Sequence, residues 1–331
     1  MAPKVALITG GASGMGLAVA KALSQRPSSN WEVHILDIDQ QRGSQAASSL
    51  PNTTFHYADV TKYDVLSEAF QNAFKSHQRL DFVFANAGMI ERFNFYETHP
   101  TAELGDRGVA PPPPEPDLLS IDADLKGVIL TSYLAQHYFR ASVRETGLDQ
   151  GVGAPAASES QSLVMTASCG GLYPSFYSPL YSAAKFGVVG FMRSIANHFY
   201  ASNIRTNAIC PGIVRTSLVD QKGWAAFPQH RFVEMESVVR VVLQLAGVSV
   251  SEPEGTEAEA ELESDEKASS ARSGLTDSHG THLPTARLFG QAVEISDGGV
   301  YFRQQHEFCD EGMREVMAAT VVENQVGAII S

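Results

Sequence analysis

Cysteine, basic charge and long apolar runs are all scarce in this chain of 331 residues. Its three cysteines, Cys169, Cys210 and Cys309, lie far apart, and no two of them have the spacing of a redox motif or a metal site. The sequence therefore predicts free thiols in a reducing, cytoplasmic compartment rather than a secreted protein held together by disulfides.

No apolar stretch approaches the roughly 20 residues of a membrane-spanning helix, which argues against an integral membrane protein. The apolar run at residues 5–8 is too short for a secretory signal, and residues 327–331 match no retention or lipidation signal. The chain carries 37 acidic and 24 basic residues, a net charge of −13. Because this excess repels phosphate, neither nucleic acid nor a membrane surface is an expected partner.

Two further classes of catalyst lack their sequence signals. The ten histidines are scattered, with no His-x-x-x-His and no His/Cys pair at ligand spacing, so no metal site is predicted. No Gly-x-Ser-x-Gly turn is present, so a serine hydrolase is not indicated either.

Short apolar, β-prone runs alternate with longer helical patterns along most of the chain. This order is typical of a parallel sheet covered by helices on both faces, and the continuously apolar runs indicate strands buried on both sides. The predicted strands are residues 5–9, 32–37, 54–58, 80–85, 162–167, 204–210 and 292–295. The principal predicted helices are residues 16–25, 65–76, 118–145, 182–201 and 233–246.

Three stretches interrupt this alternation. Residues 105–117 contain four consecutive prolines, residues 147–161 are rich in small and polar residues, and residues 251–278 are acidic and serine-rich. We interpret all three as solvated insertions, the third disordered and its insertion reaching about residue 287, with a C-terminal tail at residues 303–331. Without them the chain has the length of one α/β domain, so residues 1–331 are predicted to form a single domain.

A glycine-rich turn, TGGASGMG at residues 9–16, follows the first strand and opens a helix. Such glycines let a pyrophosphate approach backbone N–H groups at a helix N-terminus. The second strand ends about 20 residues later at Asp37, where a carboxylate can bind an adenosine ribose and repel the extra phosphate of NADP. NAD is therefore favoured. Two alternatives stay open: Asp37 only caps a turn, or Arg42 turns in to bind NADP.

Three motifs in this order and spacing resemble the classical short-chain dehydrogenase/reductase family. They are TGxxxGxG at residues 9–16, Asn86-Ala87-Gly88 after the fourth strand, and Tyr181-x-x-x-Lys185. The resemblance covers about residues 4–215 and resumes near 290–302. Within the family the chain looks most similar to NAD-linked hydroxyprostaglandin dehydrogenase-like members. The resemblance implies a Rossmann-type, doubly wound α/β fold of about seven parallel strands.

The resemblance also implies which residues bind the cofactor. They fall in the glycine turn, at the ends of the next strands, on the Tyr181 helix and after the sixth strand. The implied set is Thr9, Gly10, Gly14, Met15 and Gly16 in the turn; Asp37 at the ribose; Asp59 and Val60 beside the adenine; Asn86, Ala87 and Gly88 along the cleft; Tyr181 and Lys185 at the nicotinamide ribose; and Pro211, Gly212, Val214 and Thr216 at the carboxamide.

Tyr181 and Lys185 are four residues apart on a predicted helix, so their side chains share one face. A phenol with a pKa near 10 is a poor base at neutral pH, but a neighbouring ammonium lowers that pKa. Tyr181 is thus the candidate acid/base on the substrate oxygen, assisted by Lys185. Ser168, at the end of the fifth strand, stands where the family has the serine that hydrogen-bonds this oxygen.

One position departs from the family pattern. Residues 121–128, IDADLKGV, resemble the helix that carries a catalytic asparagine in the family, but Asp124 stands at that place. An aspartate can accept the same water and add a favourable charge near Lys185, or it can over-stabilise the ammonium and slow proton exchange. We count Asp124 among the catalytic candidates with both alternatives open.

The loops expected around the substrate, residues 89–93, 169–179 and 214–232, are rich in aromatic side chains and poor in basic ones. They favour a bulky apolar small-molecule alcohol or ketone, unless these aromatics only pack against each other. The prediction is an NAD-dependent oxidoreductase that interconverts a secondary alcohol and a ketone. The alternatives are an NADPH-dependent ketone reductase and a redox-silent descendant acting as an isomerase, a cyclase or an interaction scaffold. Helices 118–145 and 182–201 resemble those that form homodimers or homotetramers in the family.

Overall fold

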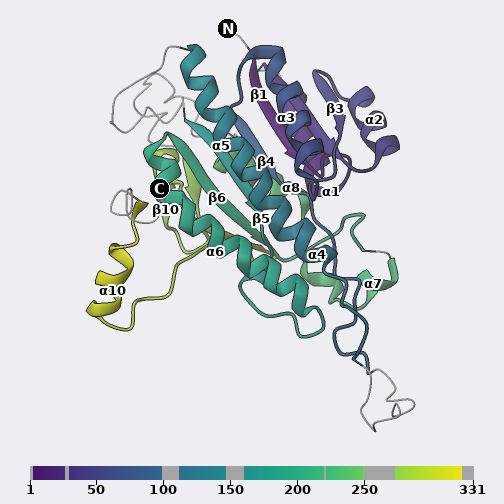
Figure 1. Ribbon diagram of the computed structural model, residues 1–331, viewed down its shortest axis with the longest axis vertical. Coiled ribbons are helices and arrows are strands. Elements are labelled where there is room, and N and C mark those ends of the chain that lie inside the picture. The colour runs from purple at the N-terminus through teal and green to yellow at the C-terminus, as the bar shows by residue number, and fades with distance from the viewer. Residues whose placement is uncertain are drawn as a thin grey trace, which may run out of the picture.

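The computed structural model describes residues 3–26, 30–98, 112–146, 160–219, 221–248, 250 and 273–322. A sheet of eight strands in the order β12-β11-β6-β5-β4-β1-β2-β3 lies between two layers of helices (Figure 1). The strands are β1 (Lys4–Thr9), β2 (Trp31–Asp37), β3 (Thr53–Tyr57), β4 (Phe82–Ala85), β5 (Gln161–Thr166), β6 (Ile204–Pro211), β11 (Ala292–Ser296) and β12 (Gly299–Arg303).

The doubly wound topology predicted from the sequence is confirmed. Strand order reverses at β1, which pairs in parallel with β2 on one side and β4 on the other. All seven predicted strands are present, with ends within two residues of those expected. Ligands of such sheets bind where the order reverses, at the carboxyl ends of the strands.

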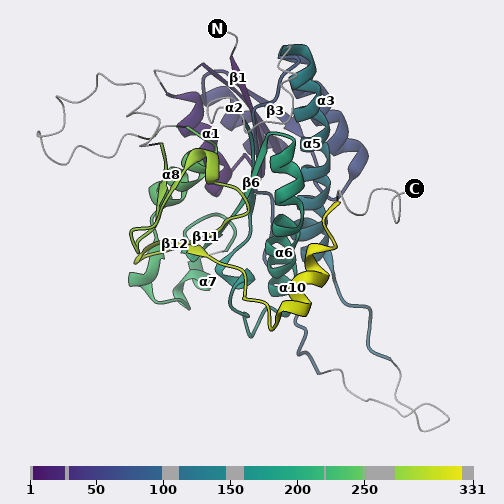
Figure 2. The ribbon, with the colours of Figure 1, turned by 90° about the vertical axis from the view of Figure 1, so that its left-hand side faces the viewer.

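Helices cover the two faces of the sheet in separate groups (Figure 2). One face carries α1 (Gly14–Ser24), α2 (Gln40–Ser49) and α8 (Met235–Leu245), and the other carries α3 (Tyr63–His77), α5 (Gly127–Thr146) and α6 (Pro179–Ala201). The short helix α4 (Leu119–Ile121) and a π-helical turn at Asp122–Lys126 lead directly into α5. The long helix predicted for residues 118–145 is therefore a composite of three segments.

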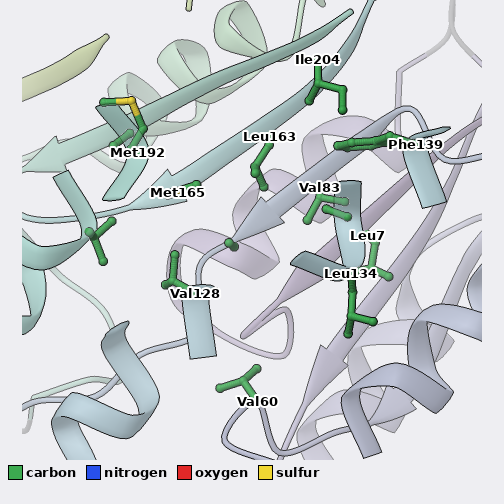
Figure 3. Packing of buried hydrophobic residues seen from close by; sticks show 14 of the residues in the cluster. Leu7, Val60, Val83, Val128, Leu134, Phe139, Leu163, Met165, Met192 and Ile204 are labelled. Atoms are coloured by element: carbon green, nitrogen blue, oxygen red, sulfur yellow. The ribbon is translucent and has the colours of Figure 1, made fainter. Parts of the chain in front are cut away.

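The continuous apolar runs are explained by burial on both faces of the sheet. In β4, Val83 packs toward α5 and α6, while its neighbours Phe82 and Phe84 pack toward α1 and α8. Figure 3 shows the first of these clusters, with Val83 beside Leu163 and near Phe139. Alternate side chains enter opposite cores because successive residues of a strand point to opposite faces.

Part of the expected third insertion is folded. Residues 273–287 include a small hairpin of β9 (Gly274–Thr276) and β10 (His282–Pro284). Leu275 is only 3% exposed within the core, and the Ser278 hydroxyl accepts the Val300 N–H at 2.9 Å. The prediction of a solvated stretch is therefore wrong for residues 273–278. Residues 105–111, 147–159 and 251–272 lie outside the described residues.

The elements that were not predicted include an edge strand and a helix of the tail. Strand β12 runs antiparallel to β11 and adds an edge to the seven parallel strands. Helix α10 (Glu311–Ala318) forms in the C-terminal tail, where its side chains are exposed. Within the described ranges, no helix has the length and apolar character needed to cross a membrane.

Candidate active site and cofactor cleft

The glycine turn after β1 has a backbone that only glycine fits easily. Gly10 and Gly14 have φ values of +65° and +54°, and a Cβ on Gly16 would lie 2.2 Å from the Gly10 carbonyl oxygen. The first hydrogen bond of α1 runs from the Leu17 N–H to the Ser13 carbonyl, at 3.1 Å. The N–H groups of residues 14–16 precede this bond and have no acceptor inside the helix, so they can face an anionic ligand.

Asp37 lies against this turn, where the sequence placed it. Its carboxylate accepts the Ala12 N–H and the Asp39 N–H, both at 3.0 Å, so it also fixes the loop after β2. A carboxylate has about four lone-pair positions, so these two bonds leave room for ribose hydroxyls. Arg42 forms an ion pair with Asp39 at 3.3 Å and is well exposed.

Asn86 holds three strands together at the carboxyl end of the sheet. Its amide nitrogen donates to the carbonyls of Thr9 (3.2 Å) and Gly10 (3.4 Å), and its amide oxygen accepts the Thr166 hydroxyl (3.1 Å). The Thr9 hydroxyl in turn accepts the N–H groups of Asn86 (3.0 Å) and Ala87 (3.1 Å). These bonds fix the ends of β1, β4 and β5 relative to one another. The side chains of Asn86 and Thr9 therefore determine where the glycine turn lies relative to β5.

The remaining cofactor candidates divide between the two ends of the cleft. Asp59 accepts the N–H and hydroxyl of Thr61, at 2.9 and 2.8 Å, and so caps the turn after β3. At the other end, a Cβ on Gly14 would lie 3.2 Å from Thr216, which follows β6 by five residues. The fold thus brings the glycine turn next to the segment after β6, although some 200 residues separate them.

Tyr181 and Lys185 project from the first turns of α6 toward the end of β5. The Lys185 ammonium is buried, donates to the Thr166 carbonyl at 3.1 Å and lies 5.5 Å from the Tyr181 ring centre. Ser168 follows β5, and its hydroxyl accepts the Gly170 N–H at 3.0 Å. A Cβ on Gly170 would be 3.3 Å from the Tyr181 ring and 3.5 Å from the Ser168 hydroxyl, which shows how closely these groups are packed.

The pKa values of Tyr181 and Lys185 follow from burial and from the neighbouring charges of Lys185 and Asp124. Burial raises the pKa of Tyr181, while Lys185 and a hydrogen bond with Ser168 act in the opposite direction. Burial alone lowers the pKa of Lys185, but Asp124 and Tyr181 outweigh it, so the net pKa is raised. The phenol is therefore protonated at neutral pH in this arrangement, next to a permanently charged ammonium.

Asp124 lies directly beside Lys185. It is 0% exposed within the π-helical turn, and its Oδ2 is 3.4 Å from the Lys185 Nζ. Its Oδ1 accepts the Met89 N–H at 2.7 Å. Burial raises the pKa of Asp124, and Lys185 and the Met89 N–H oppose that shift. Single π-helical turns inside helices occur frequently at functional sites.

Besides the bond between Met89 and Asp124, two contacts of the candidate site were not found from the sequence. The Thr166 carbonyl that receives Lys185 is a backbone group, which no side-chain pattern reveals. The Glu91 carboxylate accepts the Tyr181 N–H at 3.0 Å, but the sequence indicated only that Glu91 belongs to a substrate-facing loop.

The aromatic residues of the loops expected around the substrate fall into two groups, one packed within its own loop and one exposed. Trp224, in α7 (Gln221–Ala225), packs on Phe227 and Phe232 with ring centres 6.2 and 5.8 Å apart, so this group stabilises its own loop. Phe176 and Tyr177, in the loop between Ser168 and α6, are instead 85% and 71% exposed. No group of three or more His, Cys, Asp or Glu side chains in the described ranges is arranged to hold a metal.

Residues 4–109 and 146–225 match the family model described as short chain dehydrogenase. The chain belongs to the short-chain dehydrogenase family. Short-chain dehydrogenases are oxidoreductases that act on CH–OH groups with NAD or NADP, so the family, the fold and the enzyme class expected from the sequence are confirmed.

Known proteins similar to this short-chain dehydrogenase differ in their sequence identity to it and in the share of the chain that aligns. The short-chain dehydrogenase/reductase prx7 of Penicillium rubens is 62% identical over 317 residues, 96% of this chain and 100% of that protein. Human 15-hydroxyprostaglandin dehydrogenase [NAD(+)] is 29% identical over 225 residues, covering 66% of this chain and 70% of the human protein. The actinorhodin polyketide ketoreductase, solved as a variant with NADPH, aligns with a TM-score of 0.57 at 23% identity, covering 74% of this chain and 90% of the ketoreductase.

Proposed function

We propose that this short-chain dehydrogenase is NAD-dependent and interconverts a secondary alcohol and a ketone. The observation that carries the proposal is the convergence of Tyr181, Ser168 and the buried Lys185–Asp124 pair beside the Asn86 network, which ties β5 to the glycine turn. This arrangement places a proton donor next to the cleft in which a nicotinamide ring would lie.

The cleft fits a dinucleotide. The close approach of Gly16 to Gly10 leaves no room for a side chain, as a pyrophosphate cradle requires. Residues of the turn would hold the pyrophosphate, Asp37 the adenosine ribose, and the segment from Gly212 to Thr216 the nicotinamide end. When bound, the cofactor supplies or accepts the hydride.

The preference for NAD rests on charge. A carboxylate at Asp37 repels a 2′-phosphate, and Arg42 is paired with Asp39 rather than turned toward that position. The name of the human relative includes NAD(+), whereas the actinorhodin ketoreductase was solved with NADPH. The preference for NAD in this chain therefore rests on Asp37 and Arg42.

In ketone reduction, the protonated Tyr181 phenol donates its proton to the substrate oxygen as the hydride reaches the carbonyl carbon. The Ser168 hydroxyl donates a hydrogen bond to the same oxygen and stabilises the charge that develops there. Lys185 stabilises the phenolate that remains, and Asp124 offsets the cost of keeping the ammonium buried. Alcohol oxidation uses the same groups in reverse order.

The substrate is proposed to be bulky and apolar. Phe176 and Tyr177 expose large aromatic surfaces on the loop that joins Ser168 to the Tyr181 helix, and such surface is commonly a binding site.

On the outer sides of α5 and α6, Tyr133 and Phe186 are 62% and 44% exposed, which supports a homodimer or homotetramer formed through these helices. The three unpaired cysteines agree with a cytoplasmic location.

Binding of NADH and NADPH to the purified protein tests the proposal, with nicotinamide fluorescence and thermal unfolding as readouts. A ligand at 100 times its dissociation constant stabilises the fold by about 2.7 kcal/mol, a measurable effect. We expect NADH to bind more tightly, and Tyr181→Phe to abolish turnover while keeping NADH affinity. Tighter NADPH binding would overturn the role of Asp37, and binding of neither would overturn the redox function.

A further inference from the structure

The helix that carries Tyr181 and Lys185 starts without a cap of its own. Its N-cap residue, Ser178, makes no side-chain capping bond within the described part of the chain, and Pro179 at the first position has no N–H to donate. Tyr181 is the third residue of α6, so its N–H belongs to the first turn, which has no acceptor inside the helix.

Glu91 provides that acceptor from a distant part of the chain. Its Oε2 lies 3.0 Å from the Tyr181 nitrogen, across 90 residues of sequence. A carboxylate at this place forms a charge-assisted hydrogen bond and faces the positive end of the helix dipole, two effects that add. The backbone of Tyr181 is thereby fixed from outside the helix.

The same loop is anchored at the other side of the site. Two residues before Glu91, the Met89 N–H donates to Asp124 at 2.7 Å. A Cβ on Gly88 would lie 2.8 Å from the same Asp124 oxygen, so the loop fits tightly against the π-helical turn. Residues 88–91 therefore connect Asp124 to Tyr181, with one hydrogen bond at each end.

The second carboxylate oxygen of Glu91 differs from the first in its surroundings. Oε1 is buried and has no hydrogen-bond partner among the described residues. A buried acceptor without a partner costs free energy, which offsets part of the stability that the bond to the Tyr181 N–H contributes. The net contribution of Glu91 to stability is therefore smaller than that of a fully paired capping residue.

We infer that Glu91 is a positioning residue for Tyr181. Its hydrogen bond sets the place of the first turn of α6, and hence the place of the phenol relative to Ser168 and Lys185. Displacement of a reacting group by about 1 Å costs on the order of a hundredfold in rate. This inference rests on the proposed role of Tyr181 as the acid/base.

Three substitutions at Glu91 separate the effect of the hydrogen-bond acceptor from the effect of the negative charge. Glu91→Gln keeps an oxygen at the same reach without the charge, Glu91→Asp keeps the charge but withdraws the oxygen by one methylene, and Glu91→Met removes both. Glu97, an exposed glutamate of the same segment, offers the matched control Glu97→Met. Each variant is assayed as the full chain for NADH affinity, thermal unfolding and the pH dependence of kcat.

We expect kcat to fall about tenfold or more in Glu91→Met and Glu91→Asp and to stay within about threefold of wild type in Glu91→Gln. NADH affinity remains within about twofold in all of them, and Glu97→Met is unaffected. In the two weakened variants, the pH profile for oxidation moves to higher pH, because the phenol lies farther from Lys185. Thermal stability does not follow kcat, because Glu91→Met has two opposite effects on it: the bond to the Tyr181 N–H is lost, and the unpartnered oxygen is removed.

Wild-type turnover in both Glu91→Met and Glu91→Asp would overturn the inference. So would equal losses in Glu91→Gln and Glu91→Met, because the charge rather than the hydrogen bond would then matter. If Glu91→Met does not fold, the contrast between Glu91→Asp and Glu91→Gln decides alone. Turnover by Tyr181→Phe would contradict the proposed function instead, and leave the hydrogen bond of Glu91 without a catalytic partner.

Discussion

The Asp124 carboxylate and the Lys185 ammonium lie 3.4 Å apart, and the exposed fractions of their side chains are 0% and 4%. Burying both charges costs desolvation free energy, which their attraction and the Met89 N–H offset. An asparagine at this place would hold the same N–H but carry no charge. Asp124 therefore acts on the ionisation of its neighbours as well as on the backbone.

Asp124→Asn should move the pH dependence of the reaction. Asp124 raises the pKa of both Lys185 and Tyr181, so loss of its charge lowers both. If Tyr181 is the base, as proposed, oxidation requires its phenolate, and the kcat/KM profile for alcohol oxidation should move to lower pH. At a pH below the pKa of Tyr181, the oxidation rate should rise about tenfold for each pH unit by which that pKa falls.

The matched control is Asp122→Asn in the same turn. Asp122 forms an exposed pair with Lys126 at 3.6 Å, away from Lys185, so its neutralisation should leave the profile in place. An Asp124→Asn profile that coincides with the wild type would show that the carboxylate has only a structural role.

The fold was predictable where burial leaves a pattern in the sequence. Most of the parallel strands are apolar runs buried on both faces, although the edge strand β3 is only partly buried. Strand β12 has one buried residue, Val300, among half-buried ones and gives a weak signal. Helix α2 is made mainly of Gln, Ser and Ala, and only Gly43 and Ala46 are buried, so it lacks an apolar periodicity. Its N-terminus is instead stabilised by Asp39, which accepts the Arg42 N–H at 2.9 Å.

The site was predictable where spacing along one element carries the chemistry. Tyr181 and Lys185 share a helix face, and the glycine turn follows a strand, so local sequence was sufficient. The contacts of Glu91 with Tyr181 and of Met89 with Asp124 join segments 90 and 35 residues apart. Only the fold brings these residues together, and no periodicity marks them.

Gly16→Ala should weaken cofactor binding strongly. The new Cβ would lie 2.2 Å from the Gly10 carbonyl oxygen and 2.8 Å from the Asn86 amide, so the turn must open. We expect NADH affinity to fall at least tenfold, measured by fluorescence titration. Gly190→Ala is the control, because a Cβ at Gly190 meets nothing within 4 Å and should leave NADH affinity unchanged. Wild-type NADH affinity in Gly16→Ala would contradict the proposal that the glycine turn holds the pyrophosphate of the cofactor.

Arg303 should hold the loop that follows Ser168. Its guanidinium donates to the Tyr173 hydroxyl at 2.7 Å and pairs with Glu294 at 3.2 Å, and the Tyr173 hydroxyl donates to Glu294 at 3.1 Å. Arg303→Met removes this link between β12 and the substrate loop. We expect the substrate KM to rise several-fold while NADH affinity stays unchanged, because the cofactor turn is not touched.

Tyr173→Phe tests whether the link itself is responsible. It removes only the hydroxyl, so it should reproduce part of the rise in KM, and the double variant should be no worse than Arg303→Met alone. Fully additive effects would mean that the two residues act independently and that no shared contact orders the loop.

His34 should make the folded state sensitive to mild acid. Its ring is 1% exposed, with Nδ1 2.9 Å from His56 Nε2 and Nε2 3.2 Å from Glu32. The pKa of His34 is lowered from 6.5 to about 4, mainly by burial and also by the neighbouring His56, while Glu32 opposes the shift. Between pH 6.5 and 4 the unfolded chain therefore binds this proton more readily, so stability is lost as the pH falls through that window.

Urea unfolding at pH 7 and pH 5 measures this loss. The lowered pKa of His34 alone predicts that the free energy of unfolding drops by about 2 kcal/mol between these pH values. His34→Gln, which cannot bind the proton, should show a drop smaller by about that amount, whereas the exposed His230→Gln should keep the wild-type difference. A wild-type protein equally stable at both pH values, or a His34→Gln variant with an unchanged drop, would contradict a buried neutral imidazole.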